Sequence, residues 1–597
     1  MQQPPRLQLG ARRTEHTPAA LARVTPPPVL LPAIRRWSPR SVGRHTSTLR
    51  RLCGELLLGG LLLALCFWLL LPLPGEAQPA SPAAHLLPTH FPWLSALWWP
   101  ERLPWLVAAL SHFAWLDIRG GQAAASNLAA LILGVALLLL FLTARLCRRA
   151  ARERLPHRAL HVLLALLCLF TLLYGIGCVL LPASLTQEAL LSGLWGHVAL
   201  AYHLNPYLLA GADRVLAHDP LYLALWPGSF AAPQTLGPAW LDLTVPLSWL
   251  ARDTPALVVL VFRLAGLGLH LLNALLIWAV LGRLKPELRL PGTLLYAWNP
   301  VFLLLGIVEM QAQLAVIFFL LLALLLLQHR LLQLSWVALL LAALIYPLCL
   351  LLLPLFLRPL ARQARLLARR SRLFWWMGLL GVSVLVVTLA YAPYWPGPGM
   401  GGIAVHLRAV LWPAAMPGSL LAALQDLPFA SWPPGALLLH HAHWMALLGV
   451  LVGGLLLLGV WVTDNLELAL LFASWILLVL VLLFPLNLPW LILPSLALSV
   501  ASSSRRTALL AHLLSAGSLL AYALAFWPAH RGSLALITLG LPALIWGWLL
   551  FFVSTWQMTH HGEEEVHAQQ RRRRPGLSRP SWPTRPAAWP TRPGQQR

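Results

Sequence analysis

Residues 52–73 read LCGELLLGGLLLALCFWLLLPL, a run in which Glu55 is the one charged residue. A helix needs about 20 apolar residues to cross a hydrocarbon core, and this run has that length. Similar runs rich in Leu, Ala, Val and Trp recur along the chain. They do not alternate between polar and apolar residues, as the strands of a membrane barrel do. The sequence therefore predicts an all-α, polytopic membrane protein.

The composition supports this fold class. Hydrophobic residues make up 59% of the chain and charged residues 10%, whereas ordinary soluble domains have about 25% charged residues. The formal net charge is +24, but the arginines gather in both tails and in short loops between apolar runs. That distribution follows the positive-inside rule. Nucleic-acid binding would need a compact basic domain, so we expect contact with a lipid bilayer and none with nucleic acid.

The basic loops set the expected topology. With the N-terminus inside, spans fall at about 54–73, 125–145 and 159–182, and the basic loop RLCRRAARERLPHR (145–158) is cytoplasmic. The run at about 334–357 starts and ends inside, so a break at Tyr346-Pro347 would make it a re-entrant helical hairpin. We count about 12 transmembrane helices plus that hairpin, with both termini cytoplasmic in the cell membrane.

The domain organisation follows from this topology. Segments at both ends are rich in Pro, Arg and polar residues and cannot bury a core. We expect a disordered basic cytoplasmic tail at 1–52, a multi-span membrane domain at 53–558 and a second such tail at 559–597. The expected external loops lie at about 74–124, 183–253 and 396–440.

Two acids on the expected outer side stand close to apolar runs. Glu188 lies within about two helical turns of the exit of the third span. Glu309 lies at the tip of a tight pair of spans (296–327), at or just under the membrane surface, together with Gln311 and Gln313. Charged and amide groups at such depth usually face a protein interior or an aqueous cavity. A carboxylate there also suits a helix N-terminus, so a purely capping role remains a second reading.

Metal binding has little support in the sequence. The six cysteines lie in or beside apolar runs without C-x-x-C spacing, and are expected to be small buried hydrophobes. The cluster His440, His441 and His443 has metal-ligand chemistry but no matching carboxylate pattern. No cofactor is indicated, and a divalent metal is possible but unsupported.

Six segments together carry a resemblance to a known family. They are LTQEALLSGLWGHVALAYHLNPY (185–207), PQTLGPAWL (233–241), YAWNP (296–300), YPLCLLLLPLFL (346–357), YAPYWPG (391–397) and FPLNLPWLILP (484–494). In this order, over roughly residues 125–500, they resemble bacterial polytopic GT-C-class glycosyltransferases of the polyprenyl-phosphate-mannose-dependent mannosyltransferase type. Each motif is weak alone, and the ordered set carries the resemblance.

The resemblance implies a hexosyltransferase whose site faces outward. Its donor would be a sugar, with mannose as one candidate, linked to polyprenyl phosphate, and its acceptor a lipid- or wall-linked glycan or glycolipid. Glu188 would be the catalytic base that takes the proton of the acceptor hydroxyl. The substrate-binding residues would be Gln187, Asn205, Tyr207, Asp219, Trp240, Glu309, Gln311, Gln313, Tyr346 and Trp490.

Three departures from the family pattern keep other functions open. The family's paired acids fall on Gln187 and Glu188, its His-Asn-Asp falls on residues 311–313, and its lysine falls on Tyr346. A tyrosine can donate one hydrogen bond to a phosphate but carries no charge. One alternative is therefore a catalytically inactive relative that binds glycolipid or acts as a scaffold. Another is a lipid or glycan transporter, a class that also uses broken helices.

Overall fold

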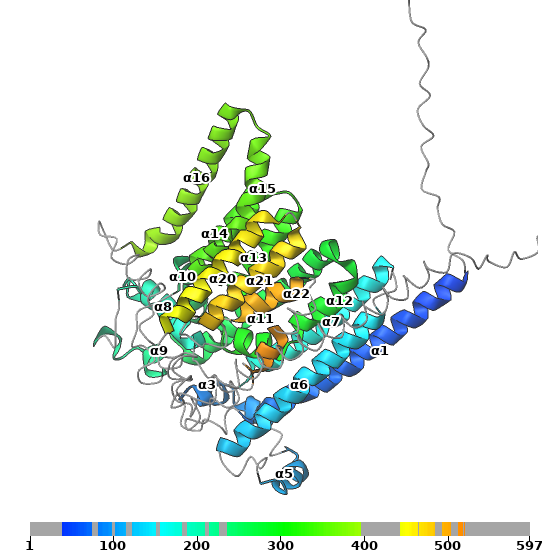
Figure 1. The fold of residues 1–597 in the computed structure, drawn as a ribbon. Helices are drawn as coiled ribbons and strands as arrows, with labels where there is room; N and C mark the ends of the chain where they lie inside the picture. The colour runs from blue at the N-terminus through cyan, green and yellow to red at the C-terminus, as the bar shows by residue number, and fades with distance from the viewer. Residues whose placement is uncertain are drawn as a thin grey trace, which may run out of the picture. The chain divides into compact units, whose positions relative to one another are not determined.

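The structure is a computed structural model that describes residues 39–73, 82–97, 102–114, 122–150, 156–181, 188–208, 214–225, 236–395, 442–463, 465–483, 492–502, 511–517 and 519. Every regular element in these ranges is a helix (Figure 1), which confirms the all-α prediction. The chain divides into two units, Met1–Thr48 and Leu49–Arg597, and the contacts described below lie within the second. Gln187, Trp490, His440 and His441 fall outside the described residues.

The first three predicted spans are present as long apolar helices. They are α1 (Pro39–Leu70), α6 (Gln122–Ala150) and α7 (His157–Val179). Glycines bring α1 close to the other two, because a Cβ added at Gly59 would overlap Thr143 of α6 and one added at Gly60 would lie 2.8 Å from Phe170 of α7. The hydroxyl of Tyr174 on α7 donates to the carbonyl of Gly60 at 2.7 Å.

Helix α11 (Pro255–Leu284) lies at the centre of the packing, against α7, α8, α10, α12 and α13. Helices α8 (Glu188–Ala201) and α10 (Pro238–Ala251) pack closely on each other and on α11. Ser248 donates to the carbonyl of Gly193 at 2.9 Å, and a Cβ at Gly196 would lie 2.8 Å from the carbonyl oxygen of Thr244. Small residues on α8 thus let the two backbones approach.

A sharp break separates α12 (Arg289–Ala297) from the π-helix η5 (Phe302–Val308), and the two are bent by 54°. Pro300 has no amide hydrogen and disfavours helical geometry at the residue before it. The side chain of Asn299 accepts a hydrogen bond from the amide of Val301 at 3.0 Å, which caps the new segment. The break therefore lies within the Asn-Pro motif.

The chain then forms α13 (Gln313–Gln328), α14 (Leu332–Ile345), η6 (Pro347–Leu352), α15 (Leu353–Arg365) and α16 (Arg369–Tyr391). The predicted break at Tyr346-Pro347 is confirmed, since α14 ends at Ile345 and η6 begins at Pro347. The segment Pro347–Arg365 is, however, long and apolar enough to cross a membrane itself. The bent helix pair that the structure contains lies at 298–301 rather than in the expected hairpin.

Six helices among the described residues are long and apolar enough to span a membrane, or seven if the bent pair counts as one span. The chain is thus a multi-pass helical membrane protein, and the expected 12 spans are not shown. Shorter apolar helices include α13, α14, α20 (Ala442–Val462), α21 (Leu466–Leu483) and α22 (Ile492–Ala501). The remaining helical elements are α3 (Pro82–His90), η1 (Pro92–Leu97), α5 (Pro104–Ser111), η3 (Arg214–Leu216), α9 (Pro220–Leu223), η4 (Pro286–Leu288) and η7 (Ala392–Tyr394).

Candidate functional site

Glu188 is the first residue of α8, so its carboxylate lies at a helix N-terminus. The hydroxyl of Ser192, one turn later, lies 3.5 Å from its Oε1. Trp240, near the start of α10, donates its indole N–H to the Ser192 oxygen at 3.2 Å. Two segments that the sequence singled out separately, LTQEALLSGLW and LGPAW, are therefore joined side chain to side chain.

Burial and, to a lesser extent, the nearby carboxylate of Glu309 raise the pKa of Glu188 to about 7, against the lowering effect of the Ser192 hydroxyl. Glu309 is fully buried, directly after η5. The two acids stand far apart in the sequence, and the fold brings them within electrostatic reach of each other. A carboxyl group with a pKa near 7 can both take and release a proton at neutral pH.

The connection that carries Glu309 is held by α11. Arg263, 1% exposed, donates to the carbonyl of Val308 at 3.0 Å and to the carbonyl of Val179 at 3.1 Å, and also to that of Leu181. It thereby ties the end of α7 to the end of η5. The N-cap residue of α13 is Ala312, and no side chain caps this helix. The reading of Glu309 as the capping residue of α13 is therefore not supported.

Helix α11 carries a polar stripe with a period of three to four residues, formed by Arg263, His270 and Asn273. His270 Nε2 lies 2.9 Å from the carbonyl of Ala297, where α12 ends, and Asn273 donates to the carbonyl of Leu314 at 3.0 Å, where α13 starts. Arg263 and His270 thus satisfy carbonyls at the ends of η5 and α12, and Asn273 ties α11 to the first turn of α13. The stripe explains how a broken chain remains stable inside an apolar protein.

A second group of contacts joins Asn205 and Tyr207 to the YAPYW segment. The amide of Asn205 donates to the carbonyl of Tyr394, and the ring of Tyr207 packs edge-on against that of Tyr394 with centroids 6.0 Å apart. Tyr394 in turn donates to Asp242 Oδ1 at 3.1 Å. The Tyr207 hydroxyl donates to the carbonyl of Leu236 at 2.9 Å. The Asn-Pro-Tyr motif therefore contacts both later motifs.

The break at Tyr346, at the end of α14, also lies against the start of α10. The amide of Gly237 donates to the carbonyl of Ile345 at 2.9 Å. A Cβ at Gly237 would overlap the carbonyl of Leu344, so glycine is required for this approach. Tyr346, half-buried, follows directly. The start of α10 and the end of α14 thus lie against each other.

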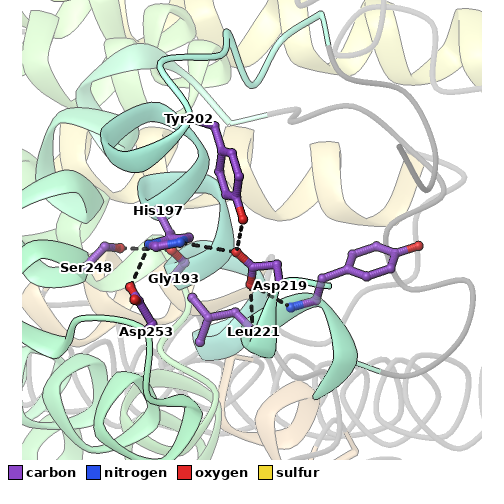
Figure 2. Close-up of polar contacts among 8 residues, drawn as sticks. Gly193, His197, Tyr202, Asp219, Leu221, Ser248 and Asp253 are labelled. Atoms are coloured by element: carbon purple, nitrogen blue, oxygen red, sulfur yellow. Dashed lines mark hydrogen bonds and ion pairs between the residues drawn. The ribbon is translucent and has the colours of Figure 1, made fainter. Parts of the chain in front are cut away.

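Asp219 lies in a separate cluster, shown in Figure 2. Its Oδ2 lies 3.2 Å from His197 Nε2 and accepts from the Tyr202 hydroxyl at 3.0 Å. Its Oδ1 accepts from the amides of Leu221 and Tyr222 at 2.7 and 3.2 Å, which caps α9. The other ring nitrogen of His197 lies 3.5 Å from Asp253.

These contacts set the charges in the Asp219 cluster. Burial raises the pKa of Asp219, but the bonds from His197, from the two amides and from Tyr202 outweigh it and lower the pKa overall. The bond to Asp219 raises the pKa of His197, against the effect of burial. Because carboxylates face both ring nitrogens, the imidazolium form fits this arrangement best. The cluster is an ion pair that holds the end of α8 against α9.

The remaining expected site residues have weaker connections. Gln311 and Gln313 are buried, 3% and 4% exposed, and Gln313 is the first residue of α13. The described residues contain no group of three or more His, Cys, Asp or Glu side chains able to hold a metal ion. The structure thus joins Glu188, Glu309 and Trp240 in one place, with Asn205, Tyr207 and Tyr346 linked through the start of α10.

Three residues of these clusters were missed by the sequence analysis: Ser192, His197 and Arg263. Arg263 had a signal, since it is the one charged residue in the apolar run VVLVFRLAGLGLHLLN (258–273), and a charge inside a span marks an internal partner. Ser192 and His197 had none, because their importance depends on α10 and α9, which pack against α8 only in the folded chain.

No protein-family model matches the chain, and neither does any curated protein or solved structure. The structure therefore defines a class, a multi-pass helical membrane protein, and not a family.

Proposed function

We propose that the chain is a membrane glycosyltransferase that moves a sugar from a polyprenyl-phosphate donor to an extracytoplasmic lipid- or wall-linked acceptor. The observation that supports this most is the meeting of Glu188 and Glu309, with a pKa of about 7 at Glu188. A carboxylate with that pKa is suited to take the proton of an acceptor hydroxyl at neutral pH. The resemblance of the ordered motifs to GT-C-class enzymes supplies the reaction type.

Glu188 is the base in this proposal. It takes the proton of the acceptor hydroxyl as that oxygen attacks the anomeric carbon, and the bond from that carbon to the lipid phosphate breaks, with inversion. Glu309 keeps the pKa of Glu188 high, which makes Glu188 a stronger base than an exposed carboxylate. The leaving phosphate takes the bonding electrons as a lipid monophosphate. Tyr346, half-buried beside the start of α10, provides an aromatic face and a hydroxyl for a sugar ring.

The test is the glycolipid profile, by mass spectrometry, of a deletion strain complemented with the wild-type chain or with Glu188→Gln. The proposal expects a glycan species that is lost in the deletion and returns with the wild type alone. The mass difference then identifies the sugar class. Asp253→Asn is a matched control, because Asp253 is an exposed acid away from the pair. Restoration by Glu188→Gln would contradict the proposal.

A transporter of lipids or glycans is the second candidate, and one observation favours it. At the 54° break between α12 and η5, two buried polar atoms have no hydrogen-bond partner among the described residues: His270 Nδ1 and Asn299 Nδ2. Broken helices with polar linings are used as transport sites. A transporter that uses this break would retain lipid flux in Glu188→Gln, whereas a transferase with its base at Glu188 would lose turnover. Flux of a fluorescent lipid in proteoliposomes separates the two.

A further inference from the structure

The contacts around Ser192 fix the direction of its hydrogen bonds. Ser192 is fully buried and Trp240 is 1% exposed. An indole nitrogen can donate but cannot accept. The contact of 3.2 Å between Trp240 Nε1 and Ser192 Oγ therefore makes the serine oxygen the acceptor. The hydroxyl hydrogen is left for the carboxylate of Glu188, whose Oε1 lies 3.5 Å away.

Other hydroxyls in the helices of this protein behave differently. Thr143, Thr171, Thr293 and Ser383 each donate to the carbonyl four residues earlier, at 2.7 to 2.8 Å. This is the usual local bond of a serine or threonine inside a helix. The equivalent bond of Ser192 would go to the backbone of Glu188. Its hydroxyl instead faces the side chain of Glu188, on the side that Trp240 leaves open.

We propose that Trp240 and Ser192 form a positioning relay, in which the indole orients the serine hydroxyl so that it donates to the Glu188 carboxylate and favours its ionised form. Neither residue reacts with a substrate. The link from this relay to catalysis rests on the proposed role of Glu188 as a base. The relay itself concerns the ionisation of Glu188 and can be measured without a substrate.

The distance between Ser192 Oγ and Glu188 Oε1 agrees with a hydroxyl that responds to the ionisation of Glu188. At 3.5 Å it is long for an O–H···O bond, whose usual length is about 2.7 to 2.8 Å. Bonds to an ionised acceptor are shorter and stronger than bonds to a neutral one. We therefore expect the contact to shorten when Glu188 loses its proton, and to be long while the carboxyl group is neutral.

The other charged groups around α8 are already engaged. From η5, Glu309 faces Glu188 and raises its pKa. On α11, Arg263 donates to the carbonyls of Val308 and Val179. On α10, Asp242 accepts from Tyr394. Asp219 before α9 and His197 on α8 pair with each other. Through Ser192, the relay connects Trp240 of α10 to the Glu188 carboxyl group.

The experiment measures the pKa of Glu188 in the full chain, reconstituted in lipid nanodiscs. Infrared difference spectra over a pH titration follow the protonated carboxyl band, and subtraction of Glu188→Gln spectra assigns it. We expect Trp240→Phe and Ser192→Ala each to raise this pKa by about one unit, because each removes a bond that stabilises the ionised form. The double variant should match Ser192→Ala alone, since both changes interrupt one relay.

Trp298→Phe is the matched control. Trp298 is also fully buried, and its indole donates at 3.2 Å, but to the backbone carbonyl of Leu167. Trp298→Phe should leave the pKa of Glu188 unchanged. The relay is wrong if the Trp240 and Ser192 variants leave the pKa in place, if their shifts add, or if the control shifts it equally. A further outcome is that the two variants shift the Glu188 pKa without additivity while Glu188→Gln still restores the glycan. That result would support the relay and contradict the proposed transferase.

Discussion

A carboxyl group lies at each end of helix α8, Glu188 as its first residue and Asp219, the cap of α9, against His197, and the two have opposite properties. At its start, burial and the nearby carboxylate of Glu309 raise the pKa of Glu188, against the effect of the Ser192 hydroxyl 3.5 Å away. Near its end, the Asp219 carboxylate receives bonds from His197, Tyr202 and two amides, and its pKa is lowered although burial acts to raise it. Burial acts on both acids: the bonds to Asp219 outweigh it, whereas at Glu188 it outweighs the bond from Ser192. Asp219 is thereby suited to hold structure, and Glu188 to exchange a proton.

The largest expected effect is on transfer by Glu188→Gln. Glutamine keeps the shape of the side chain but cannot take a proton, so the rate of sugar transfer should fall about 100- to 10,000-fold. The fold should survive, because the change removes a carboxyl group that burial already penalises. Transfer from a polyprenyl-phosphate sugar in membranes measures the rate, and thermal unfolding in detergent measures the fold. If Glu188→Gln lost transfer only in proportion to its loss of folded protein, Glu188 would have a structural role like that of Asp219.

Asp219→Ala should do the opposite and damage the fold. It removes the cap of α9 and leaves the charge of His197 without its buried partner, and breaking a buried ion pair costs about 3 to 5 kcal/mol. Urea unfolding in detergent, followed by tryptophan fluorescence, measures the free energy of unfolding. Glu188→Gln is the control on the same helix. A stable Asp219→Ala protein would show that the cluster in Figure 2 does not hold α8 to α9.

The next effect concerns pH. Because the base must be ionised, the rate of transfer should rise with pH through a value near 7, the raised pKa of Glu188. Glu309→Gln removes the neighbouring carboxylate, so this rise should move to lower pH by about one unit. Rates measured from pH 5 to 9 in both proteins test it. A rise at the same pH in both would mean that the two carboxyl groups do not interact.

The sequence predicted part of this arrangement. The apolar runs located three long helices, and Tyr346-Pro347 located a break, because length and proline act locally. Glu188 and Glu309 were recognised as unusual for their depth, but their interaction depends on η5, whose bend at Asn299-Pro300 was not predicted. Asp219 was expected beside Glu188 in one pocket, and the fold places it in a separate ion pair with His197. That pairing could not be predicted, because only the turn of α9 toward α8 brings the residues together.

The smallest effect should come from Asp253→Asn, which weakens the outer contact of His197. The side chain of Asp253 is 70% exposed, and exposed ion pairs contribute about 0 to 1 kcal/mol. The folded state raises the pKa of His197, so the contribution of this contact is fully present below the ordinary histidine pKa of about 6.5 and is lost as pH rises through the raised value. Unfolding of wild type and Asp253→Asn should therefore differ slightly at pH 6 and not at pH 9. Equal stability of the two proteins at pH 6 would indicate that Asp253 does not stabilise a charged His197, and that Asp219 alone holds the end of α8.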